Sequence, residues 1–333
     1  MTHYLLEASD ALFQNPSILL LLSLAHAHIF LNKVLLHGPS LVRLAAVIPT
    51  IYIFSVIPWS FPSALIRGLL SYFITWIASF KLLAFCFRRT TGGPRVIPTS
   101  TASSFLDFAT IAIFPFKPNE AVKDNAARSI FWDVAPLAWL VTLLNLYILI
   151  IQRSQTTSNY HFSILLFYLA AVFSWQILVR FMTRYEVVPV FDKPYLATSL
   201  REFWGKRWNK YSSFMLRLTV YDPARTLLNR CVGITSARLT ATLVTLAVSG
   251  VMHELMAYYI TCGKKPTWEA SWYFVLQGVS MWCESLLKYV WLRVLRWRPI
   301  RPITSMLLVD GFVVASFYLF IFKPISKSGQ NQC

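Results

Sequence analysis

Long apolar blocks separated by short polar stretches dominate the pattern of hydrophobic and polar positions along this chain. A helix needs about 20 apolar residues to cross the hydrocarbon core of a bilayer, and the blocks have that length instead of alternating every second residue. The pattern predicts an all-α integral membrane protein with about eight transmembrane helices. We expect these helices at residues 11–32, 41–59, 62–87, 132–151, 161–182, 240–259, 268–291 and 303–322.

Two stretches between the blocks do not fit a simple span. Residues 99–130 are less apolar, and a proline interrupts their short hydrophobic run, so we expect an interfacial or re-entrant segment there. Residues 183–239 form the longest polar region. Because no internal repeat or low-complexity segment divides the chain, residues 1–333 are predicted to form a single polytopic membrane domain.

The charge composition bears on the partners of the protein. The chain has 31 basic and 14 acidic residues and a formal net charge of +17, but charged residues make up only 14% of it, against about 25% in a soluble domain. The basic residues lie between apolar blocks, as in loops that face the cytosol and anionic lipid headgroups. We therefore expect membrane lipids, and an anionic cosubstrate, rather than nucleic acid as partners.

An amphipathic pattern lies inside the polar region, between Thr198 and Leu216. At about 100° per residue, one helical face collects Leu200, Phe203, Trp204, Trp208, Tyr211 and Met215. The opposite face collects Glu202, Gly205, Lys206 and Asn209. The pattern predicts a helix in the membrane interface, with a modest ion pair between Glu202 and Lys206. A simple interfacial anchor would explain it, but Asn209 in the middle of the polar face favours a polar cavity.

Basic side chains surround this predicted helix and could bind phosphates. The candidates for a cosubstrate-binding site are Lys206, Arg207, Lys210 and Arg225, with Arg217 and Arg230 nearby. Further along, Asp222 is predicted to be a helix N-cap and Pro223 the first helical residue. A helix N-terminus at that point would add its own attraction for an anion.

The sixth predicted span contains an ionisable pair, His253 and Glu254. Such groups usually face a cavity or a partner, because placing one in a span costs about 2.5–3.5 kcal/mol. The face that carries His253 also carries the small residues Ser249, Gly250 and Ala257, which would let another helix or a substrate come close. Two interpretations stay open for His253: a structural histidine bonded between helices, or a general base that takes a proton from a hydroxyl. Glu254 could support the histidine, although it points about 100° away, and a partner from another helix is equally plausible.

Other catalytic patterns are missing from the sequence. A zinc-protease motif needs a second histidine where Ala257 stands, and His26 and His28 point to different faces of their span, so no metal site is predicted. The chain also has no GxSxG elbow, P-loop or GxGxxG. Without a nucleophile motif, direct attack by a hydroxyl that His253 deprotonates is simpler than a covalent enzyme intermediate.

Four motifs in the second half of the chain resemble the wax synthase-like branch of the membrane-bound O-acyltransferases. They are FWGKRWN at 203–209, VYDP at 220–223, SGVMHEL at 249–255 and PTWE at 266–269. Each motif alone is weak, but four in the family's order are specific, and FKLL at 80–83 and FDKP at 191–194 extend the likeness from about residue 70 to the C-terminus. The differences are conservative: Lys206 stands for an arginine and Val251 for a leucine.

The resemblance implies an MBOAT-like fold and an enzyme that moves an acyl group from acyl-CoA, a cosubstrate rather than a tightly bound cofactor, to the hydroxyl of a lipid alcohol. It also implies that His253 and Asn209 are the catalytic residues, since they match the histidine and asparagine of the family's motifs. We expect wax ester synthesis from a long-chain fatty alcohol by a multi-pass protein of the endoplasmic reticulum membrane. Sterol, diacylglycerol and terpenoid acceptors, and short donors such as acetyl-CoA, stay open. A transporter or a non-catalytic lipid-binding protein is the alternative from another class.

Overall fold

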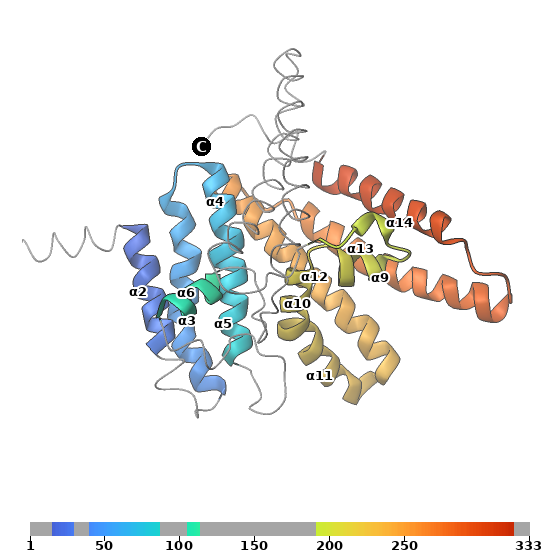
Figure 1. Cartoon of the computed structure of the whole chain (residues 1–333), viewed down its shortest axis with the longest axis horizontal. Helices are drawn as coiled ribbons and strands as arrows, with labels where there is room; N and C mark the ends of the chain where they lie inside the picture. Colours follow the sequence, from blue (N-terminus) through green and yellow to red (C-terminus); the bar gives the residue numbers. More distant parts are fainter. Residues whose placement is uncertain (1–14, 30–39, 87–104, 114–190, 323–333) are drawn as a thin grey trace, which may run out of the picture.

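The computed structural model describes residues 15–29, 40–86, 105–113 and 191–322. Every regular element within those ranges is a helix, which confirms the all-α prediction for them (Figure 1). The first part comprises α2 (Pro16–Ile29), α3 (Ser40–Val56), a 3-10 turn (Ile57–Ser60), α4 (Ala64–Leu70), a π-helical stretch (Ser71–Ala78), α5 (Ser79–Cys86) and α6 (Phe105–Ile113). The second part comprises a 3-10 turn (Pro194–Leu196), α9 (Leu200–Glu202), α10 (Lys210–Leu216), α11 (Asp222–Val232), α12 (Ile234–Ile260), α13 (Glu269–Tyr289) and α14 (Pro302–Phe317). Short π-helical stretches follow α9, α10, α13 and α14, at Phe203–Arg207, Arg217–Tyr221, Val290–Val294 and Tyr318–Phe322.

Four of these helical runs are long and apolar enough to cross a membrane: Leu41–Ser60, Ile66–Ala84, Ile234–Ile260 and Pro302–Ile321. They coincide with four of the predicted spans. Helix α2, of 14 residues, covers the described part of the first predicted span, whose ends lie outside the described residues, and α13 coincides with the seventh. The spans expected at 132–151 and 161–182, and most of the segment 99–130, lie outside the described residues, so the count of about eight stays a prediction.

In the first part, α2 and α5 pack on α3, and α6 packs on α2 and on the Ser71–Ala78 stretch (Figure 1, blue to green). The first part meets the second through α4 on α12, α5 on α10, and the Ser71–Ala78 stretch on α12. His26 Nδ1 lies 3.1 Å from Thr50 Oγ1, which joins α2 to α3. The buried Arg67 side chain donates from Nε to the backbone oxygen of Tyr259 at 2.8 Å. Close by, a Cβ on Gly68 would lie 3.0 Å from the side chain of Ile260, so α4 packs tightly on the C-terminal end of α12.

Helices α12 and α13 form an antiparallel pair, and two glycines bring them close together (Figure 1, orange). A Cβ added to Gly250 would lie 2.7 Å from Cα of Ser271, and one added to Gly278 would lie 2.8 Å from Cδ1 of Leu243. Small residues let helix backbones approach in this way. The stripe of small residues predicted around His253 therefore packs against another helix at Gly250.

The segment predicted as one interfacial helix, Thr198–Leu216, is broken, and that prediction is wrong. The π-helical turn at Phe203–Arg207 widens the backbone, and the N–H of Trp208 bonds five residues back, to Phe203, at 2.8 Å. Trp208 is then extended and Asn209 takes a left-handed conformation, with φ 39° and ψ 61°, before α10 begins. The face assignment survives locally, because four of its six apolar members are buried: Leu200, Phe203, Tyr211 and Met215.

The predicted helix start at Asp222 is wrong as well. A π-helical turn, Arg217–Tyr221, runs directly into α11, so no free N-terminus forms at Pro223. The Asp222 side chain makes no capping bond to the backbone and lies instead 3.8 Å from Nε of Arg217. The carboxylate is therefore paired with a guanidinium, and the anion site expected from an open helix end is not formed there.

Candidate active site

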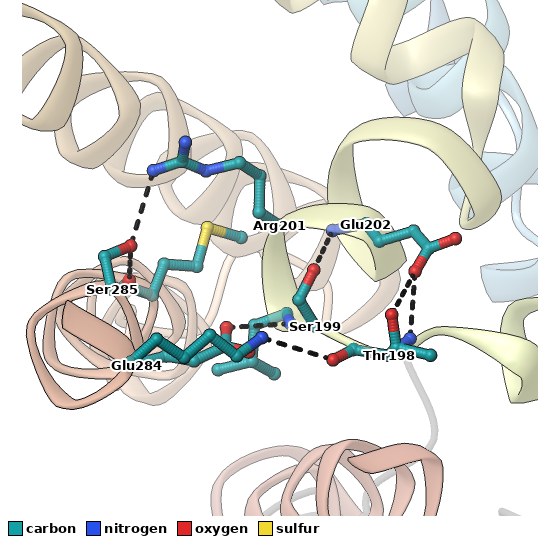
Figure 2. A network of polar contacts seen from close by, with 9 residues as sticks. Thr198, Ser199, Arg201, Glu202, Glu284 and Ser285 are labelled. Carbon is teal, nitrogen blue, oxygen red and sulfur yellow. Dashed lines mark hydrogen bonds and ion pairs between the residues drawn. The ribbon is translucent and has the colours of Figure 1, made fainter. Parts of the chain in front are cut away.

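The FWGKRWN segment begins at a capping box built from Ser199 and Glu202 (Figure 2). Ser199 Oγ accepts the backbone N–H of Glu202 at 3.1 Å, and Glu202 Oε2 accepts the backbone N–H and the hydroxyl of Thr198, both at 2.9 Å. The arrangement is a variant of the capping box, because the carboxylate bonds the amide of the residue before the N-cap instead of the amide of Ser199 itself. The pattern S-x-x-E is visible in the sequence, and it would have predicted a helix start at Leu200.

Helix α13 holds the same segment from the other side (Figure 2). Glu284 Oε2 accepts the backbone N–H of Leu200 at 3.0 Å, while its Oε1 pairs with Nζ of Lys288 at 2.7 Å. One turn further, the indole N–H of Trp204 donates to Oε1 of the fully buried Gln277 at 3.1 Å. The position of the motif thus depends on α13 as much as on its own helix propensity.

The partner of Glu202 is Arg207, so the predicted pair with Lys206 is wrong. Oε1 of Glu202 lies 2.8 Å from Nη2 and 2.9 Å from Nε of Arg207. The π-helical turn brings residue i+5, instead of i+4, beside the carboxylate. The backbone N–H of Thr198, followed by the Arg207 guanidinium, lowers the pKa of Glu202 to about 2. At neutral pH the Glu202 carboxylate is therefore charged, and it bonds Thr198 before the π-helical turn and Arg207 at its end.

Asn209 caps α10 and reaches across to the first part of the chain. Its Oδ1 accepts the backbone N–H of Ser212 at 3.1 Å, and its Nδ2 donates to the hydroxyl of Tyr72 at 3.4 Å. Asparagine tolerates the left-handed conformation found here better than most residues. One amide hydrogen of Nδ2 has no hydrogen-bond acceptor among the described residues, so the side chain keeps a donor for another molecule.

His253 has one ring nitrogen fixed by the backbone of its own helix. Nδ1 lies 2.7 Å from the carbonyl oxygen of Ser249. Because a carbonyl can only accept, Nδ1 carries the proton, and neutral His253 presents an unprotonated Nε2. The ring lies between Trp76 and Phe274, with centroids at 5.2 and 4.4 Å. The arrangement holds the imidazole in one tautomer and one orientation, as a general base requires.

Glu254 contacts α13, and no bond to the imidazole of its neighbour is described. This side chain is 5% exposed, and its Oε1 accepts the backbone N–H of Trp268 at 2.8 Å. Trp268 has a left-handed conformation, φ 63°, immediately before α13 begins. The carboxylate thus stabilises the first turn of α13, the helix that places Phe274 against His253.

A cavity of about 350 Å³ has both His253 and Asn209 in its wall. Helix α12 contributes a polar stripe at helical spacing: Arg238, Thr242, Thr245, Ser249 and His253. Over fifteen residues this stripe covers about 22 Å. The hydroxyls of Thr242 and Thr245 donate to backbone carbonyls one turn back, at 2.9 and 2.6 Å. Since each hydroxyl donates its hydrogen to the backbone, its oxygen can act only as an acceptor for another molecule.

The predicted basic residues do not all meet at this cavity. Lys206 lines it. Arg207 is paired with Glu202, Lys210 lies 3.5 Å from Oδ2 of Asp192, and Arg225 packs over the Tyr221 ring, so none of these three lines it. The other cations in the wall are Arg201, Arg217 and Arg238. The prediction from sequence did not include Arg201 or Arg238. Arg238 nevertheless follows the helical spacing of the α12 stripe, because it stands four, seven, eleven and fifteen residues before the other members.

Metal ligands do not cluster in the part of the chain that the structure describes. No group of three or more His, Cys, Asp and Glu side chains is close enough there to hold an ion. The imidazoles of α2 are engaged in packing, since His28 stacks obliquely on Phe108 of α6 at 5.0 Å.

Comparison with known proteins finds a family model and several relatives that this chain matches. Residues 187–276, which include both Asn209 and His253, match the model of the membrane bound O-acyl transferase family. The chain is 34% identical to a probable long-chain-alcohol O-fatty-acyltransferase 3 of Arabidopsis thaliana over 86% of its length and 82% of the relative. It is 32% identical to the long-chain-alcohol O-fatty-acyltransferase of Simmondsia chinensis, over 88% and 84%. An acyl-CoA–sterol O-acyltransferase 1 of Arabidopsis thaliana is 30% identical over 84% and 81%.

Proposed function

This chain belongs to the membrane-bound O-acyltransferase family, and from that premise we propose that it esterifies a long-chain fatty alcohol with the acyl group of acyl-CoA, to give a wax ester. The observation that carries the proposal is one cavity lined by His253, Asn209 and four cationic side chains. An anionic donor, a base and a hydrogen-bond donor for an oxyanion are what acyl transfer to a hydroxyl needs.

His253 acts as the general base in this proposal. The alcohol hydroxyl donates to Nε2, which takes the proton as the oxygen attacks the thioester carbonyl. The carbon–oxygen bond forms first and the carbonyl oxygen becomes an oxyanion; the carbon–sulfur bond then breaks, and the imidazolium returns the proton to the CoA thiolate. The bond from Nδ1 to the carbonyl of Ser249 keeps the imidazole in the required tautomer throughout.

Asn209 supports the oxyanion through the amide hydrogen that has no acceptor among the described residues. Removing one such donor commonly costs about 2.7–4 kcal/mol of transition-state stabilisation. The capping bond from Oδ1 to Ser212 and the contact with Tyr72 fix the amide before the substrate arrives. Preorganisation of that kind is the source of oxyanion stabilisation, since nothing has to move as charge develops.

The cations that line the cavity suit the phosphates of CoA. They include Lys206, Arg217 and Arg238, and guanidinium groups match phosphate oxygens in geometry and charge. The α12 stripe then leads from Arg238 to His253, with acceptor oxygens on Thr242 and Thr245 that suit the amide N–H groups of the pantetheine arm. We assign donor binding to these residues, with Arg201, in preference to Arg207, Lys210 and Arg225.

The relatives support a fatty alcohol as the first acceptor to test and a sterol as the second, since their names state those acceptors. We further propose residence in the endoplasmic reticulum membrane, where apolar alcohol and ester can enter and leave sideways through lipid. Co-fractionation with a marker of that membrane checks the location. Distribution with plasma-membrane markers would contradict it.

The decisive experiment uses yeast microsomes that lack their own neutral-lipid acyltransferases. Labelled long-chain acyl-CoA and acetyl-CoA are supplied with a fatty alcohol, a sterol, diacylglycerol or a terpenoid alcohol, and the labelled esters are separated. We expect wax ester from the long-chain donor and the fatty alcohol, dependent on His253. Ester from another acceptor would keep the reaction and correct the substrate, and absence of ester from every pair would contradict the proposed activity.

A further inference from the structure

The segment between α13 and α14 is strongly basic and exposed. It carries four arginines within nine residues and no acidic residue from 290 to 309: Arg293, Arg296, Arg298 and Arg301. All four are exposed. Within the described part of the chain their guanidinium groups make no hydrogen bond or ion pair. The segment 290–301, termed the arginine loop below, therefore presents four positive charges outward.

The arginine loop is folded on itself and is not an open strand. The indole N–H of Trp291 donates to the backbone oxygen of Arg298 at 2.9 Å. The backbone N–H of Trp297 donates to the backbone oxygen of Trp291 at 3.1 Å. The two indole rings meet edge to face, with centroids 4.5 Å apart. Arg296 has a left-handed conformation, φ 50°, at the turn. These contacts hold the backbone of the loop in a defined turn, which carries all four arginines.

Apolar side chains accompany the charges on the same surface. Trp297 is 53% exposed and Val294 is 63% exposed, and both alternate with arginines. Exposed tryptophan next to arginine is typical of the boundary between hydrocarbon and headgroups, where the ring enters the lipid and the cation meets phosphate. The loop joins α13 to α14, and α14 begins one of the runs long enough to span a membrane, so the loop lies where that boundary is expected.

The packing of α12 on α13 shows at which end of the helices the loop lies. Gly250 of α12 faces Ser271 of α13, and Leu243, seven residues earlier in α12, faces Gly278, seven residues later in α13. The two helices therefore run in opposite directions. The end of α13 is therefore level with the start of α12, on the side of the α11–α12 corner. That side also carries Arg225, Arg230 and Arg238, whereas the opposite loop, residues 261–268, carries Lys264 and Lys265. The larger basic excess marks the first side as cytosolic.

We propose that the arginine loop binds the headgroups of anionic phospholipids in the cytosolic leaflet. The guanidinium groups contact lipid phosphates, and Trp297 with Val294 enters the outer part of the hydrocarbon. Binding there fixes the depth of the α13–α14 hairpin in the bilayer. This proposal concerns a surface outside the cavity and does not depend on the acyltransferase reaction.

Photocrosslinking in nanodiscs tests the proposal on the full chain. Phosphatidylserine and phosphatidylcholine with a photoreactive headgroup are compared, and labelled peptides are identified by mass spectrometry. We expect at least several-fold more labelling of peptide 290–301 by phosphatidylserine than by phosphatidylcholine, and a decrease as salt is raised. Equal labelling by the two lipids would overturn the proposal.

Two quadruple variants and one control separate charge from folding. Arg293→Gln, Arg296→Gln, Arg298→Gln and Arg301→Gln together should lose the preference, while lysine at the same four positions should retain most of it. The matched control, Lys264→Gln with Lys265→Gln in the opposite loop, should label as the unmodified chain does. A preference that persists in the glutamine variant, or displacement of the label by free CoA, would contradict lipid binding at this loop.

Discussion

Helix α12 and the segment from Thr198 to Tyr221 both supply the cavity, but their backbones differ. Helix α12 runs without interruption over 27 residues and places its polar groups by helical spacing alone. The other segment changes conformation four times and contains an extended and a left-handed residue, Trp208 and Asn209. Its course is set by side-chain bonds to backbone groups, chiefly those of Ser199, Glu202 and Glu284.

The difference separates two ways of positioning the side chains that we propose to be catalytic. His253 needs a fixed tautomer, and a continuous helix provides the carbonyl of Ser249 one turn away. Asn209 needs its amide turned toward a cavity that no helical face would reach, and a break in the helix provides that. We expect the position of His253 on α12 to tolerate changes in side chains elsewhere. We expect the position of Asn209 to change when the side-chain bonds that hold the break at Trp208 are removed.

The largest effect is expected on the α12 side, from His253→Ala. Loss of a general base typically lowers turnover by about 10²–10⁴-fold. We expect a decrease of that size in ester formation, with unchanged accumulation in membranes. His26→Gln is the matched control, because that imidazole bonds Thr50 between α2 and α3 and lies away from the cavity. Equal activity of His253→Ala and the unmodified chain would remove the base from the mechanism.

The next effect concerns the approach of α12 to α13. Gly250→Val must push Ser271 away, since even a Cβ would lie 2.7 Å from its Cα. Phe274 would then leave His253, and a displacement of about 1 Å can cost about 10²-fold in rate. We expect a loss of that order in turnover. Gly311→Ala, at a helical glycine with open space around it, should leave turnover unchanged; an equal loss there would make the effect unspecific.

On the other segment, Asn209→Ala and Asn209→Gly divide the two tasks of the asparagine. Glycine accepts the left-handed conformation, so we expect it to retain more thermal stability than alanine does. Both variants remove the amide, and we expect turnover to fall about tenfold or more in each. Recovery of turnover in the glycine variant would assign Asn209 a purely structural role. Thermal unfolding in detergent and the ester assay provide the two readings.

A smaller effect is expected from the cations that line the cavity. Arg238→Gln removes an exposed charge, worth about 1 kcal/mol, so the KM for acyl-CoA should rise about fivefold with little change in kcat. The rise should be greatest at low salt. Arg225→Gln is the control, because that guanidinium packs over Tyr221 and lies outside the cavity wall. A larger effect at Arg225 than at Arg238 would reverse our assignment of the donor phosphates.

The smallest effect is one of stability, at Glu202. Its pKa is lowered to about 2 from an ordinary 4.5, so its stabilisation is fully present above about pH 5 and is lost as the pH falls from 4.5 toward 2. Glu202→Gln should therefore lower the melting temperature at pH 7 and make less difference at pH 3, measured by thermal unfolding in detergent. A difference that stays constant with pH would show that the charge of Glu202 is immaterial.

The two regions also differ in how far the sequence predicts them. The 3.6-residue period gave α12, the placement of His253 and the small residues at Gly250, because a regular helix follows from spacing alone. The break at Trp208 could not be obtained that way, because a π-helical turn departs from the 3.6-residue period and the segment is also bonded to Glu284 and Gln277 of α13, which are distant in sequence. Motif likeness pointed to Asn209 without its conformation, and it gave no information on Arg238, which joins the site through the α12 stripe.

Release of CoA with and without the acceptor tests the central claim most directly. Purified protein in nanodiscs is mixed with acyl-CoA, and the free thiol is followed over time before and after a long-chain alcohol is added. We predict thiol release only after alcohol addition, in equal amount to the ester formed, and almost none from His253→Gln. A burst of thiol before alcohol is added, with acyl label retained on the protein, or undiminished release from His253→Gln, would contradict direct attack by an alcohol that His253 deprotonates.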